Sequence, residues 1–224
     1  LTKSNKSGAW AQKSDIYRNA FDNAAYGQDY MSDASYSTVV NVYYNLLILG
    51  TPRAVGRFFK DVEDGLVSRV LFAEIPSQAG KRMPHFPRFS ASVQKHNAKL
   101  IDALSSSEDS FNLEYLNKAI DRWLEQRRLD FLRTQNMALE IFRRRAAVIG
   151  FRAGMVAVAC YKADEKEDEA HLSRYRNRIK AFAFWVANYA LTALLSRYGG
   201  EMQEVTSRDG CGSTSVYYVD VFSR

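Results

Sequence analysis

The sequence predicts an α/β fold in which a strand–helix–strand (βαβ) unit is followed by a mainly α-helical bundle. Two observations support this prediction. A continuous apolar run at residues 45–49 and a second predicted strand at residues 69–75 flank a helix-forming stretch, as in a parallel sheet covered by helices. From residue 88 onward, apolar side chains recur instead at the three- and four-residue steps of helices.

The N-terminal part is expected to contain one short helix before the first strand. Residues 1–13 are polar, and Ser14 is a suitable N-cap for a helix that stops at Gly27. A polar loop over residues 28–37 then leads into the first apolar run. This run ends at Gly50, where a turn is expected.

The second predicted helix begins at Thr51-Pro52. A threonine hydroxyl caps the first turn, and proline suits the first helical position. The helix ends at Asp64-Gly65, before the second strand. Its apolar residues are Val55, Phe58, Phe59 and Val62. Strand, helix and strand together form one unit of a parallel sheet.

A proline-rich loop at residues 76–89 is the expected domain boundary. It divides the chain into a core at 1–87, a helical bundle at 88–200 and a tail at 201–224. Within the bundle, helices are predicted near residues 93–104, 116–127, 135–161 and 169–198, with Gly199-Gly200 ending the last one.

Composition and charge favour an anionic partner. The chain of 224 residues has a net charge of +6, which suits nucleic acid or nucleotide. Its two cysteines and three histidines lack metal-ligand spacing, so no metal site is expected. Asn188 and Thr192 interrupt the longest apolar stretch, residues 181–195, which predicts a buried helix and no membrane span. With no leader segment visible, the expected location is the cytoplasm.

The arginines of the helix at 135–161 are candidate ligand-binding residues. Arg145 and Arg152 fall within a predicted apolar stripe, made of Ala138, Ile141, Phe142, Val148, Ile149, Met155, Val156 and Ala159. A guanidinium there needs a partner, either a phosphate or a buried acid. Arg143 and Arg144 are expected on other faces, solvated or in contact with nucleic acid.

The order of residues 45–69 matches elements that occur late in P-loop ATPases, where positioned polar groups and cations stabilise the transferred phosphoryl group. Thr51 at a strand tip is the candidate sensor, with Asn45 as the second choice. Arg69, before the next strand, is the candidate arginine finger. The plainer interpretations are a helix N-cap for Thr51 and a surface ion pair for Arg69.

Two segments carry a resemblance to a known group: Tyr44-Asn-Leu-Leu-Ile-Leu-Gly-Thr-Pro52 and Glu63-Asp-Gly-Leu-Val-Ser-Arg-Val-Leu-Phe72. There the chain resembles the uncharacterised primase/helicase-associated P-loop ATPase-like proteins of bacterial mobile elements and prophages, a domain of unknown function. The resemblance implies a partial P-loop-type sheet, with Thr51 as sensor and Arg69 as finger. It leaves the lid arginine open between Arg145 and Arg152.

The sequence lacks a G-x-x-x-x-G-K-[ST] loop. ATP and magnesium are therefore expected only with an upstream half, which implies a truncated chain or a split gene. The leading hypothesis is the C-terminal part of a replication helicase that forms a homo-oligomeric ring on DNA. The alternative is a non-catalytic basic helical module that binds DNA or a partner protein. A purely structural role is a third possibility.

Overall fold

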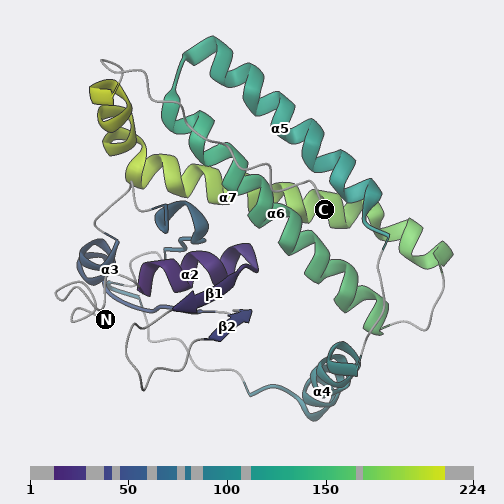
Figure 1. The fold of residues 1–224 in the computed structure, drawn as a ribbon. Coiled ribbons are helices and arrows are strands. Elements are labelled where there is room, and N and C mark those ends of the chain that lie inside the picture. Colours follow the sequence, from purple (N-terminus) through teal and green to yellow (C-terminus); the bar gives the residue numbers. More distant parts are fainter. Residues whose placement is uncertain are drawn as a thin grey trace. The chain divides into compact units, whose positions relative to one another are not determined.

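The computed structural model describes residues 13–28, 38–41, 46–59, 65–74, 79–81, 88–106, 112–164 and 169–209 (Figure 1). The chain divides into two compact units. The first comprises residues 1–70 and 198–224, and the second comprises residues 71–197.

The described residues are mainly helical, so the predicted parallel βαβ sheet is wrong. Their sheet is one antiparallel pair, β1 (Ala25–Gln28) with β2 (Thr38–Asn41), in which Ala25 faces Asn41. Residues 46–50 are not a strand, and Leu47 and Leu49 are 82% and 81% exposed. An apolar run forms a strand only where a neighbouring strand satisfies its backbone groups.

The second predicted strand, residues 69–75, is also wrong. Arg69 ends a short 3-10 helix, η1 (Val67–Arg69), and residues 70–74 do not form a strand. Within the segment, Phe72 is buried but Leu71 is 46% exposed. Arg69 therefore does not lie at the mouth of a strand.

The first unit also contains the helices α2 and α3. α2 (Lys13–Asp22) lies near the predicted position but ends before Gly27, which belongs to β1. α3 (Pro52–Phe58) begins as predicted, because the Thr51 hydroxyl accepts a hydrogen bond from the Ala54 amide at 3.3 Å. Phe58 contacts the ring of Tyr17 edge-on, at 6.5 Å between centroids.

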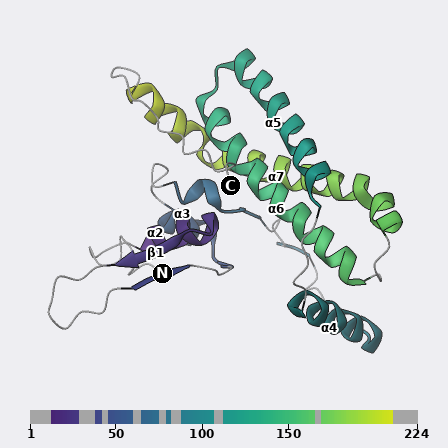
Figure 2. The ribbon, with the colours of Figure 1, turned by 45° about the vertical axis from the view of Figure 1, so that its right-hand side comes forward.

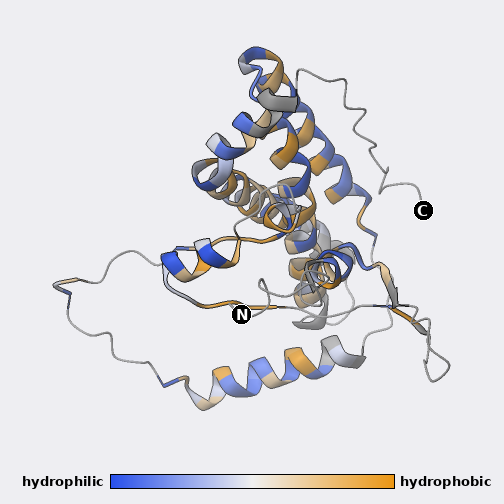
Figure 3. Cartoon of the chain, turned by 60° about the vertical axis from the view of Figure 1, so that its left-hand side comes forward, coloured by the Kyte–Doolittle hydropathy of each residue, from blue (hydrophilic) through white to orange (hydrophobic). Residues whose placement is uncertain are grey.

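The four helices predicted for the second unit are confirmed. They are α4 (Ala91–Ser106), α5 (Glu114–Thr134), α6 (Met137–Asp164) and α7 (Glu169–Asp209), which continues beyond this unit. α4 contacts α6, but most of its side chains are exposed, and hydrophilic residues predominate along it (Figure 3).

The predicted end of α7 at Gly199-Gly200 is wrong, because the helix continues to Asp209. Tyr198 and Met202, on either side of the glycine pair, are 5% and 7% exposed. Burial of both side chains offsets the helix cost of two glycines, which is about 1 kcal/mol each.

The helices α5, α6 and α7 pack together through small residues. α5 and α6 are neighbours joined by the short turn at Gln135, whose φ of 53° is left-handed (Figures 1 and 2). α7 meets α6 at Gly150, where an added Cβ would lie 2.7 Å from the Ala183 carbonyl oxygen. At Gly154 an added Cβ would lie 2.7 Å from a methyl of Leu116 on α5. Glycine thus permits the close approach of the three helices.

The buried face of α6 differs from the predicted apolar stripe. Ala138, Phe142 and Ile149 are buried as predicted, but Met155 and Val156 are 37% and 62% exposed. The buried face also includes Ala146, Ala147, Gly150, Gly154 and Arg143. Small residues face the neighbouring helices because the helix backbones lie too close together there for larger side chains.

Candidate nucleic-acid interface

The two candidate catalytic residues have structural roles in the first unit. Thr51 is exposed and caps α3. Arg69 donates to Asp22 Oδ2 from Nη2 at 2.7 Å and from Nε at 3.1 Å, and from Nη1 to the Gly65 carbonyl at 2.8 Å. Asp22 and Gly65 thus hold the Arg69 guanidinium, which agrees with the interpretation of Arg69 as an ion-pair partner. Asn45 lies outside the described residues.

Arg143 and Arg144 converge on one carboxylate of α6. Arg143 donates to Glu140 Oε1 and Oε2 at 2.6 and 2.7 Å, and Arg144 donates to Oε1 at 3.0 Å. Arg143 also donates to the Leu124 carbonyl of α5 at 3.3 Å. Its side chain is 8% exposed, so the prediction of a solvent-facing Arg143 is wrong. It joins α5 to α6.

The pKa of Glu140 reflects this arrangement. Burial raises the pKa, but the hydrogen bonds and charges of Arg143 and Arg144 outweigh burial and lower it from its ordinary value of 4.5. Glu140 is therefore ionised at neutral pH. This acid, whose side chain is 12% exposed, is a partner of the kind expected for the lid arginines, but among the ion pairs of the described residues it pairs with Arg143 rather than with Arg145 or Arg152. Arg145 and Arg152 are half-buried, and neither is without an interaction in the chain.

The solvent-facing side of α7 carries a ladder of three aromatic rings, Phe182, Trp185 and Tyr189. They are 43%, 61% and 37% exposed. The Phe182 and Trp185 rings are 6.1 Å apart between centroids and inclined by 23°, and the Trp185 and Tyr189 rings are 5.9 Å apart and inclined by 27°. We call these three residues the aromatic ladder. Exposed, nearly parallel rings of this kind provide stacking surfaces.

The ladder lies on one line of exposed residues along α7. Positions 178, 182, 185, 189, 192 and 196 follow one another at four- and three-residue steps, and all six are exposed. Such steps place side chains above one another on a helix. Arg178 begins the line, and Thr192 and Ser196 continue it past the rings.

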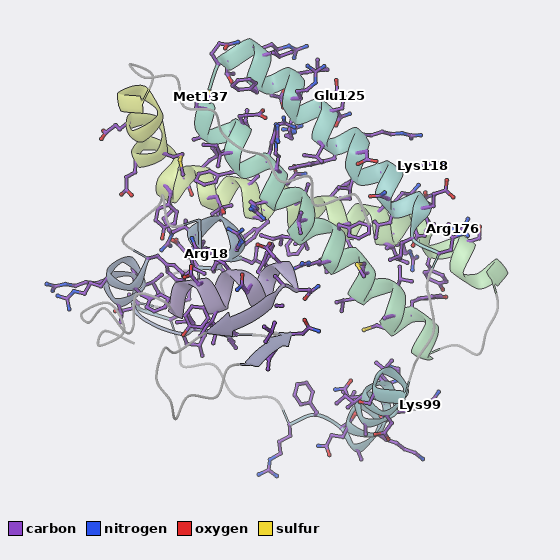
Figure 4. All side chains as sticks on the ribbon, viewed as in Figure 1. Arg18, Lys99, Lys118, Glu125, Met137 and Arg176 are labelled. Atoms are coloured by element: carbon purple, nitrogen blue, oxygen red, sulfur yellow. The ribbon has the colours of Figure 1, made fainter. Side chains whose placement is uncertain are left out.

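Basic residues predominate in the segment that carries the ladder. Residues 170–200 contain Arg174, Arg176, Arg178, Lys180 and Arg197 and no Asp or Glu, although Arg197 forms an ion pair with Glu74 from outside the segment. The Arg178 guanidinium lies over the Tyr175 ring at 5.3 Å, and Arg178 is exposed. The Arg176 guanidinium, labelled in Figure 4, lies instead over Tyr115 of α5 at 5.1 Å. Burial raises the pKa of Tyr115 against the opposing effect of this charge.

The opposite side of α7 holds the ladder in place. Ala183, Val186, Ala187, Ala190, Leu191 and Leu194 are buried. The indole of Trp123 on α5 donates to Asn188 Oδ1 at 2.9 Å, beside Tyr189 in the sequence. The packing of these residues and this hydrogen bond fix the rotation of α7 about its axis. The aromatic ladder, on the opposite side of the helix, therefore faces solvent.

Sequence reasoning missed the ladder, because it treated residues 181–195 as a wholly buried helix. The segment is buried on one side only. A signal was present: large rings occupy positions 182, 185 and 189, while the small residues Ala183, Ala187 and Ala190 occupy the other side. In a close-packed bundle the small residues face the neighbours.

The segment Tyr175–Met202 of α7 is long and apolar enough to cross a membrane, a test that a core helix of a soluble protein also passes. No group of three or more His, Cys, Asp or Glu in the described part of the chain could hold a metal ion.

Comparison with models of known protein families, with curated proteins and with solved structures gives no match. The function is therefore inferred from the geometry of the chain.

Proposed function

We propose that the chain is a non-catalytic, cytoplasmic helical module that binds DNA through the exposed line of α7. The observation that supports this proposal is the aromatic ladder, three exposed rings preceded by the exposed Arg178, in a segment (residues 170–200) that contains no acid. Cations bind phosphates with release of counterions, and aromatic rings stack on bases.

Arg178 is the residue best placed to contact a phosphate. It is exposed and lies one helical turn before Phe182, and its guanidinium lies over the Tyr175 ring rather than beside a carboxylate of the described residues. Arg144, half-exposed beside Glu140, shares a carboxylate with Arg143. Its charge is therefore already partly balanced, which makes it the weaker candidate.

The ATPase version of the proposal has less support. It would require an upstream half that binds ATP and magnesium, and a homo-oligomeric ring. It would also require a free finger at Arg69, whereas Asp22 and Gly65 hold that guanidinium. No parallel sheet occurs among the described residues to position Thr51 beside a nucleotide.

A salt titration of the full chain with fluorescein-labelled DNA tests the proposal. Binding should weaken steeply as salt rises from roughly 50 to 200 mM. Arg178→Glu should lower the affinity and reduce the slope of log K against log salt by about 1 or more. Lys99→Glu on α4 is the matched control, because it makes the same charge change at an exposed site away from the ladder. No DNA binding at the lowest salt, or equal losses in both variants, would refute the proposal.

A further inference from the structure

We infer that the aromatic ladder binds unpaired bases, so that the preferred ligand is single-stranded DNA rather than duplex. This inference rests on the proposed function and specifies its substrate class. It follows from the spacing, exposure and setting of the three rings.

The spacing of the rings suits a strand whose bases are spread apart. Successive ring centroids lie 6.1 and 5.9 Å apart, whereas bases in a B-form strand rise by about 3.4 Å. A duplex also stacks its bases on each other and offers only their edges in the grooves. Ring-to-base stacking thus requires a strand that is unpaired and unstacked.

The ladder has the form of a stacking surface for a single strand. The rings differ by only 23° and 27° in inclination from one to the next, so bases laid against them share one orientation. Arg178 stands one turn before the first ring, where a backbone phosphate of the same strand would pass. Thr192 extends the line with a hydroxyl group that suits phosphate or base contacts, whereas the Ser196 hydroxyl donates to the Ala193 carbonyl at 3.1 Å.

The same features disfavour insertion into a membrane. A helix that buries one face in lipid has an apolar line from end to end. Here the line begins with Arg178, ends with Thr192 and Ser196, and is apolar only over the three rings. The fit to an anionic strand is therefore better than the fit to an acyl layer.

Tryptophan emission gives a direct readout of stacking. The chain has three tryptophans; Trp123 is 4% exposed and Trp185 is 61% exposed. In a Trp10→Phe background, titration with oligo(dT) should quench the exposed fluorophore at Trp185. In the Trp10→Phe, Trp185→Phe variant, binding should persist and the quenching should disappear.

Affinity measurements test the preference for single strands. The full chain should bind oligo(dT) at least about tenfold more tightly than a duplex of the same length. Trp185→Ala and Tyr189→Ala should each weaken oligo(dT) binding by roughly 5- to 150-fold, the range for loss of one base–ring stack. Phe89→Ala is the matched control, because Phe89 is an aromatic residue that is 65% exposed outside α7. Far-UV circular dichroism establishes that each variant is folded.

The outcomes separate this inference from the proposed function. Equal affinity for both DNA forms, unchanged in the Trp185→Ala variant, would overturn the inference and leave the DNA-binding proposal intact. Failure to bind either form would overturn both. Two other results would also overturn the inference. One is a blue shift of Trp185 emission on anionic phosphatidylserine vesicles without quenching by oligo(dT). The other is self-association of the DNA-free protein that Trp185→Ala abolishes.

Discussion

Arg69 donates two hydrogen bonds to a single carboxylate oxygen of Asp22, 47 residues earlier in the chain. Its third contact is the carbonyl of Gly65, whose φ of +72° suits glycine. The side chains of Arg69 and Asp22 are 13% and 26% exposed. The pair links the end of α2 to η1. It gives a structural role to Arg69, which the order of residues along the sequence had suggested as a catalytic arginine finger.

Arg69→Ala is expected to destabilise the first unit by about 2 kcal/mol, because it removes the two hydrogen bonds that Arg69 donates to the partly buried Asp22 carboxylate. Hydrogen exchange of the α2 and η1 amides should accelerate. Arg69→Lys should recover only part of the protection, since an ammonium lacks the planar set of donors. Unchanged exchange in Arg69→Ala would contradict a structural role and reopen the finger hypothesis.

Glu140→Gln is expected to lower the free energy of unfolding at pH 7 by about 3 kcal/mol, because Arg143 loses its buried counter-charge. The pKa of Glu140 is lowered in the folded state. Its contribution is therefore fully present above the ordinary pKa of 4.5 and is lost as pH falls through the folded pKa. Urea unfolding from pH 7 to pH 3 should show the wild-type and variant curves converging at the acid end.

The exposed pair of Glu125 and Arg128 is the control for this measurement. The hydrogen bond from Arg128 lowers the pKa of Glu125, but both side chains are about half exposed. Salt screens exposed pairs far more than buried ones. The effect of Glu125→Gln should therefore vanish in high salt, whereas that of Glu140→Gln should persist.

Gly150→Ala is expected to destabilise the second unit by about 1–3 kcal/mol through overpacking. The added Cβ would lie 2.7 Å from both the Ala183 carbonyl oxygen and the Ala187 Cβ, so α6 and α7 would have to separate. Gly200→Ala is the contrast, because nothing lies within 4 Å of its added Cβ. It should stabilise α7 by about 0.5–1 kcal/mol. Opposite shifts in the thermal midpoint are the expected result, and equal shifts would contradict the packing at Gly150.

Thr51→Ala is expected to cost about 1 kcal/mol, because the Ala54 amide loses its cap at the start of α3. Thr51→Ser retains the hydroxyl and should keep most of the stability. The exchange rates of the first α3 amides measure the difference. If both variants behave like wild type, capping by Thr51 contributes nothing.

Some features were determined by the sequence alone because they depend on neighbours in the chain. The helices of residues 88–200 follow from apolar spacing, and α5, α6 and α7 lie where that spacing predicts, apart from their ends. The start of α3 follows from Thr51-Pro52, because a hydroxyl cap acts within one turn. Each of these depends on contacts within a few residues.

Other features were decided only by the tertiary structure. The apolar run ending at Leu49 and the run from Val70 resemble strands in isolation, but a strand needs a partner, and the described residues supply none there. Likewise, periodicity placed Arg143 in solvent, whereas the structure buries it at the contact of α6 with α5. The packing of α7 sets its rotation and turns Phe182, Trp185 and Tyr189 outward. The face of a helix that becomes buried depends on the helices that pack against it, because burial results from contacts between helices and not from the sequence of one helix.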